Sequence, residues 1–84
     1  MSDAADARLG RLRWRARRGT RELDRLLGAW LDRRYAGADE ARRADFDALL
    51  GEADPDLWDW LTGHLDPAPR YVAIVDEIRA LDRV

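Results

Sequence analysis

The sequence has no cysteine and only one serine and one histidine, Ser2 and His64. Without cysteine the chain can form neither a disulfide framework nor a thiolate metal site, which excludes zinc-finger classes and indicates an intracellular protein. His64 follows Gly63 at a predicted helix end and has no second histidine or cysteine beside which to bind a metal, so we expect it on the solvated surface. We therefore expect no catalytic residue, no metal site and no enzymatic activity.

The sequence also lacks a long apolar run and a basic leader. No segment approaches the length that spans a membrane, and the first residues, MSDAADAR, carry acids where a secretory or mitochondrial targeting sequence would carry basic residues. We therefore expect a cytoplasmic protein without membrane insertion.

The 84 residues are 46% hydrophobic and 38% charged, which suits one small domain over residues 1–84 with a flexible start at residues 1–4. Such a domain buries roughly 60% of its unfolded surface. The net charge of −2 hides an asymmetry, because residues 8–25 hold eight arginines against two acids, a local charge of +6. We interpret the acids Asp54, Asp56 and Asp59 as capping or solvated groups rather than as paired catalytic carboxylates.

The periodicity predicts an all-α fold, a compact bundle of five short helices with no strand-like alternation. Helix ends are indicated by Gly19, Gly51 and Gly63, by the start signal Asp54-Pro55-Asp56, and by the linker at residues 66–69. The helices are expected at about residues 4–18, 21–35, 39–51 and 54–63, with a fifth after the linker.

Each predicted helix carries an apolar stripe that we expect to be buried. The second stripe is the clearest, and the first is thin. The predicted core residues are Ala5, Leu9, Leu12, Ala16, Leu23, Leu26, Leu27, Trp30, Leu31, Phe46, Leu49, Leu50, Leu57, Trp60, Leu61, Tyr71, Ile74, Val75, Ile78 and Leu81.

The junction between the first two helices has the sequence R-R-G-T-R-E-L-D, residues 17–24. Gly19 can adopt the left-handed conformation that ends a helix, and Thr20 can cap the next one, so we expect a sharp corner, although a continuous kinked helix also fits. Trp14 lies nearly opposite the first stripe, with Arg18 one turn beyond it. An exposed tryptophan beside arginine is typical of a protein-binding hot spot, but Trp14 could equally pack against another helix.

Glu22 also has two interpretations. It could be purely structural, since an acid in the first turn is favoured by the helix dipole and can pair with Arg25 or Arg18. It could instead be part of a binding surface, as the following resemblance implies.

The sequence resembles the succinate dehydrogenase assembly factors, also called flavinylation factors. The resemblance rests on Trp14, on Arg17-Arg18-Gly19 and on Glu22-Leu23-Asp24, which together are similar to the Arg-Gly-x-x-Glu motif of that family. It extends in order through Tyr35, Phe46, Leu49-Leu50, Asp54-Pro55-Asp56-Leu57, Trp60-Leu61 and the final apolar helix.

The resemblance implies a chaperone-like factor that binds the flavoprotein subunit of succinate dehydrogenase or fumarate reductase and promotes covalent attachment of FAD. The histidine that becomes linked to the flavin would belong to the partner, and no cofactor would be stably bound here. The implied partner-binding residues are Arg18, Gly19 and Glu22, with Arg17 and Trp14 as neighbours. Thr20 departs from the family, where a bulkier apolar residue such as methionine is expected, so an apolar contact at that position is not implied.

Two other functions compete with this interpretation. The arginine-rich segment and the corner at Gly19 would suit a helical nucleic-acid-binding module, although the chain is acidic overall. An antitoxin-like regulatory interaction protein is the other alternative, for which the sequence offers no independent sign.

Overall fold

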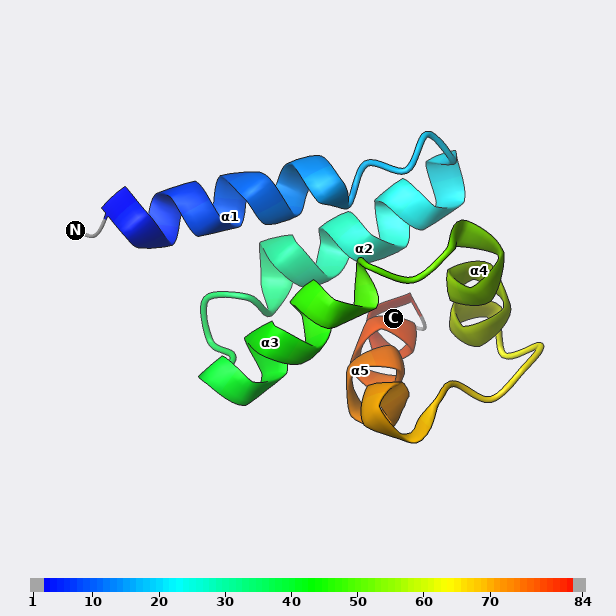
Figure 1. Ribbon diagram of the computed structural model, residues 1–84. Helices are drawn as coiled ribbons and strands as arrows, with labels where there is room; N and C mark the ends of the chain where they lie inside the picture. Colours follow the sequence, from blue (N-terminus) through cyan, green and yellow to red (C-terminus); the bar gives the residue numbers. More distant parts are fainter. Residues whose placement is uncertain (1–2, 83–84) are drawn as a thin grey trace.

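The computed structural model describes residues 3–82, which form helices joined by short loops and contain no strand (Figure 1). This confirms the predicted all-α bundle. Residues 1 and 2 of the predicted flexible start lie outside the described residues, whereas Asp3 and Ala4 belong to the first helix. The elements are α1 (Asp3–Arg15), α2 (Arg21–Arg33), α3 (Glu40–Leu49), α4 (Asp54–Thr62), the short 3-10 helix η1 (Pro69–Tyr71) and α5 (Val72–Asp82).

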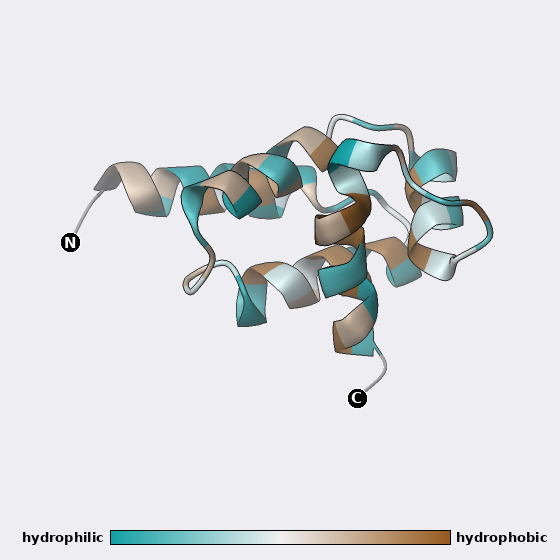
Figure 2. Ribbon diagram, turned by 90° about the horizontal axis from the view of Figure 1, so that it is seen from below, coloured by the Kyte–Doolittle hydropathy of each residue, from teal (hydrophilic) through white to brown (hydrophobic). Residues whose placement is uncertain are grey.

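Helix α2 is the central element of the bundle. It packs most extensively against α5, which also contacts α3 and α4, while α1 lies along α2 in a nearly antiparallel direction (Figure 1). The start of α1 reaches beyond the other helices, whereas its end leads into the corner above α4 (Figure 1). Hydrophobic and hydrophilic segments alternate along the helices in Figure 2, and the buried apolar residues of the helices form one core. The corner between α1 and α2 therefore lies next to a core that the helices share.

The five predicted core residues of α2 are all buried. Trp30 is fully buried, and its ring stacks on Phe46 with the ring centroids 4.5 Å apart. The indole Nε1 of Trp30 donates a hydrogen bond of 3.1 Å to Glu77. The core also includes Tyr35, which was not predicted as a core residue. The other core residues come from the stripes predicted on the other helices: Leu12, Ala16, Phe46, Leu49, Leu50, Leu57, Leu61, Tyr71, Ile74, Val75 and Ile78.

Some predicted core positions lie at the edge of the core or outside it. Ala5 is exposed and Leu9 only half-buried, because the first turns of α1 extend past the helices that could cover them. Trp60 and Leu81 are half-buried and pack against the core. Trp58, which lies to one side of its helix, is 38% exposed.

Apart from the end of α1, the predicted boundaries of α1 to α4 lie within two residues of the observed ones. Asp39 caps α3 by accepting a hydrogen bond from the Arg42 amide, and Gly63 ends α4 in the left-handed conformation with φ of 82°. Helix α1 ends at Arg15, earlier than the predicted end at Arg18. Asp54 is the first residue of α4 rather than its cap, a position that Ala53 occupies.

Candidate functional site

The corner between α1 and α2 occupies residues 16–20. Gly19 has φ of 86°, in the left-handed region that favours glycine, as predicted, although it lies four residues beyond the end of α1. Thr20 takes the extended conformation of a cap residue, but its side chain makes no capping hydrogen bond. The carboxylate of Asp24 instead reaches back and accepts a hydrogen bond of 2.6 Å from the Arg18 amide. The alternative of a continuous kinked helix is therefore wrong.

The Arg18 side chain points into the protein, although the helical projection placed it one turn beyond Trp14, opposite the apolar stripe. Only 16% of it is exposed. Its Nε donates to Asp54 at 2.7 Å, and its two Nη atoms donate to main-chain carbonyls. These carbonyls belong to Arg15 at 3.1 Å, Leu50 at 2.8 Å and Glu52 at 2.8 Å. Arg18 therefore connects the α1–α2 corner with the loop between α3 and α4 and with Asp54, the first residue of α4.

Trp14 has the opposite orientation. It is 73% exposed, the highest value among the exposed large apolar side chains described, so its alternative role in the core is wrong. Trp14, Arg17, Gly19 and Asp24 line an open hollow of ≈ 390 Å³. An indole, a guanidinium and an accessible glycine backbone in one hollow offer a partner apolar, charged and main-chain contacts.

A second hollow continues along the outer face of α1. It is lined by Ala7, Gly10, Arg11, Trp14 and Arg15, with a volume of ≈ 540 Å³. Neither Arg11 nor Gly10 was among the site residues predicted from the sequence. The signal was available, because positions 7, 10, 11 and 14 follow the three-and-four spacing of one helix face.

Glu22 lies on another side of the corner. Its side chain pairs with Arg25 at 2.8 Å, and Arg25 also binds Asp82 at 2.6 Å. Hydrogen bonds to Glu22 and Asp82 raise the pKa of the Arg25 guanidinium. The expected pairing of Glu22 is thus with Arg25. Glu22 lines a groove of ≈ 320 Å³ together with Leu26, Trp58, Leu61, Thr62, Arg79 and Asp82.

The arginine-rich segment is largely neutralised by ion pairs within the fold. Arg8, Arg13 and Arg15 pair with Glu40, Asp32 and Asp47 on other helices. The hydrogen bond from Arg8 lowers the pKa of the Glu40 carboxyl. Arg18 and Arg25 are paired as described above. Among the eight arginines of residues 8–25, those without an ion pair within residues 3–82 are Arg11, Arg17 and Arg21.

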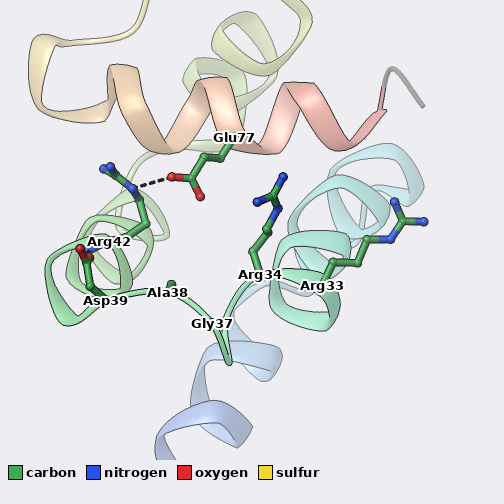
Figure 3. Close-up of a pocket in the computed structure, with 7 residues that line it drawn as sticks. All are labelled: Arg33, Arg34, Gly37, Ala38, Asp39, Arg42 and Glu77. Carbon is green, nitrogen blue, oxygen red and sulfur yellow. Dashed lines mark hydrogen bonds and ion pairs between the residues drawn. The ribbon is translucent and has the colours of Figure 1, made fainter.

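A further pocket of ≈ 450 Å³ lies at the loop between α2 and α3, facing α5 (Figure 3). Figure 3 shows Arg42 of α3 directed toward Glu77 of α5, and their Nε and Oε2 atoms are 2.6 Å apart. Glu77 also accepts the hydrogen bond of Trp30. These charged groups therefore stabilise the packing of three helices.

Other site types find no support in the described part of the chain. Residues 3–82 contain no cluster of three or more histidines, cysteines or acids that could hold a metal ion. His64 is exposed and contacts the Thr62 hydroxyl. None of the helices within residues 3–82 is long and apolar enough to cross a membrane.

Comparison with known proteins supplies the family. The family model described as "flavinator of succinate dehydrogenase" matches residues 10–82, which include the whole α1–α2 corner. The chain belongs to this flavinator family. Among solved structures, no significant match was found.

Relatives of this flavinator family member cover most of its length. The FAD assembly factor SdhE of Xylella fastidiosa strain 9a5c is 45% identical over 76 residues, which is 89% of this chain and 78% of the relative. SdhE of Methylococcus capsulatus is 44% identical over 73 residues, covering 86% and 88% of the two chains. SdhE of Legionella pneumophila strain Paris is 40% identical over 72 residues, covering 86% and 91%.

The structure of this flavinator family member separates the five residues expected to bind a partner into three environments. Trp14, Arg17 and Gly19 share the hollow at the corner. Glu22 lines the groove toward α4 and α5, and the Arg18 side chain is bound inside the fold. A partner that contacts both the hollow and the groove must therefore cover the start of α2.

Proposed function

We propose that this protein binds the flavoprotein subunit of succinate dehydrogenase, or of fumarate reductase, and promotes covalent attachment of FAD to that subunit. Membership of the flavinator family over residues 10–82 carries this proposal. In this interpretation the protein is a chaperone-like assembly factor, and the bond to FAD forms on the partner. The protein itself is neither the catalyst nor a stable FAD carrier.

The partner-binding surface proposed here centres on the α1–α2 corner. Trp14 provides a large exposed aromatic surface, and tryptophan and arginine are enriched among the residues that dominate binding energy. Arg17 adds a guanidinium that is not engaged in an ion pair within residues 3–82. Gly19 allows a partner backbone to approach closely, since a Cβ built at this position would meet no atom within 4 Å. Glu22 extends this surface toward the groove.

The cytoplasmic location of the protein stays a prediction.

Capture from cell extract tests the proposed partner. The tagged protein should retain the flavoprotein subunit of succinate dehydrogenase or fumarate reductase, identified by mass spectrometry. Deleting the gene should lower the covalently bound FAD of that subunit, measured as flavin fluorescence of the denatured protein on a gel. Complementation with the wild-type gene is the control. Normal covalent flavin in the deletion strain would contradict the proposal.

Nucleic-acid binding is expected to be weak. A protein that neutralises several phosphates with arginine loses affinity steeply as salt rises, because condensed counterions are released on binding. Here the fold itself pairs five of the eight arginines of residues 8–25 with acids. We expect no sequence-selective complex with duplex DNA near physiological salt in a fluorescence anisotropy titration. A tight, salt-sensitive and sequence-selective complex would favour the nucleic-acid-binding alternative instead.

A further inference from the structure

Arg18 uses nearly all of its hydrogen-bonding capacity inside the protein. A guanidinium carries five N–H groups, and four of them donate here to Asp54 and to the carbonyls of Arg15, Leu50 and Glu52. A partner protein could therefore receive at most one hydrogen bond from this side chain without displacing an internal one.

The main chain of the corner is fixed by a second acid. The Arg18 amide donates to the Asp24 carboxylate, and the next residue, Gly19, holds the left-handed turn. The Arg17 amide donates to the Trp14 carbonyl at 3.2 Å, which connects the corner to the end of α1. The position of the exposed Trp14 and Arg17 side chains thus depends on a segment in which both the amide and the side chain of Arg18 are hydrogen-bonded.

The loop that receives the Arg18 side chain is itself anchored in the core. The hydroxyl of the buried Tyr71 donates to the Glu52 carboxylate at 2.7 Å, and its oxygen lies 3.3 Å from the Ala48 carbonyl. Burial, together with the hydrogen bond to Glu52, raises the pKa of Tyr71. Arg18 therefore connects the exposed corner to a loop whose position is set by the packing of η1 against α3.

We propose that Arg18 is a positioning residue, which holds Trp14, Arg17 and Gly19 in the arrangement that the flavoprotein binds. Asp54 and Asp24 share this role, the first through the Arg18 side chain and the second through its amide. We call this set, Arg18 with Asp24 and Asp54, the corner clasp. The inference rests on the proposed function. In it, the clasp strengthens binding of the flavoprotein indirectly, because it fixes the conformation of the corner.

A double-mutant cycle distinguishes positioning from direct contact. The variants are Arg18→Ala, Asp54→Ala and the double variant, with binding to the purified flavoprotein subunit measured by titration calorimetry. Asp56→Ala is the matched control, because Asp56 is an exposed acid of the same first turn of α4 and forms no ion pair within the described residues. Melting curves by circular dichroism establish a temperature at which every variant is folded.

Arg18→Ala and Asp54→Ala should each weaken binding by about tenfold, since each removes charge-assisted hydrogen bonds that fix the corner. The double variant should bind no more weakly than Arg18→Ala, because both substitutions remove the same ion pair between Arg18 and Asp54. Asp56→Ala should bind like the wild type. If Asp54→Ala also binds like the wild type while Arg18→Ala binds weakly, Arg18 contacts the partner directly and the proposal is overturned.

Hydrogen exchange of the free protein provides a second readout that needs no partner. Asp54→Ala should accelerate amide exchange across residues 16–20, whereas Asp56→Ala should not. Unchanged exchange in Asp54→Ala overturns the clasp, whatever its effect on binding. Should Arg18→Ala fail to fold, Asp54→Ala decides the question by the same two readouts. If the wild type does not bind the flavoprotein, the proposed function is wrong. The exchange measurement on the free protein still tests whether Asp54 holds residues 16–20 in place.

Discussion

Replacing Trp30 by alanine should lower the free energy of unfolding by about 3 to 5 kcal/mol, as expected for truncation of a fully buried aromatic side chain. The change removes the stacking on Phe46, the edge contact with Tyr35 and the hydrogen bond to Glu77. A domain of this size is stabilised by roughly 4 to 13 kcal/mol in total. Urea denaturation followed by circular dichroism measures the loss, which should be among the largest for any single substitution.

Two other substitutions serve as comparisons for Trp30→Ala. Leu27→Ala, at a fully buried position of the same helix, should cost about 2 to 5 kcal/mol. Trp14→Ala removes a side chain of the same kind at a position that is 73% exposed, and it should change stability by about 0.5 kcal/mol or less. Equal losses for Trp30→Ala and Trp14→Ala would contradict the packing described for α2.

Trp14→Ala should instead weaken flavoprotein binding, by about 2 kcal/mol or more, which corresponds to roughly thirtyfold in Kd. An exposed indole beside guanidinium groups gains most from a partner that covers it and excludes water. Titration calorimetry with the purified flavoprotein subunit provides the measurement. This expectation depends on the proposed function, and the folded state of the variant is checked by its melting curve.

Trp14→Phe and Val72→Ala serve as controls. The phenylalanine retains an aromatic surface and should restore part of the affinity, whereas Val72 is an exposed apolar residue at the start of α5 and its removal should have no effect. Wild-type affinity in Trp14→Ala would remove this residue from the partner-binding surface.

Periodicity and local chemistry were sufficient to predict the helices and nearly all of the core. The three-and-four spacing of Leu23, Leu27 and Trp30 identifies a buried face without knowledge of what covers it. The position of Asp39 and the conformations of Gly19 and Gly63 also follow from local preferences of the residues themselves. The place of Trp14 opposite the apolar stripe left exposure and packing against another helix equally open, and the structure shows this side chain exposed.

The role of Arg18 could not be predicted in this way. Its acceptors Leu50, Glu52 and Asp54 lie 32, 34 and 36 residues further along the chain, so only tertiary packing brings them together. The helical projection places Arg18 near Trp14 only while the helix continues, but α1 ends at Arg15. The three residues after this end turn the two side chains in different directions. The resemblance indicated these residues as a group, whereas their different environments are visible only in the structure.

The pairing of α2 with α5 has a consequence for biosynthesis. Trp30 and Glu77, which join the two helices, are 47 residues apart, and Arg25 and Asp82 are 57 residues apart. A nascent chain that has emerged only as far as α4 therefore displays the apolar face of α2 without its main covering helix. At translation rates of about 5 to 20 residues per second this interval lasts a few seconds, far longer than a helix needs to form. Cooperative folding must wait for α5 to leave the ribosome, and until then the apolar face of α2 lacks its main covering helix.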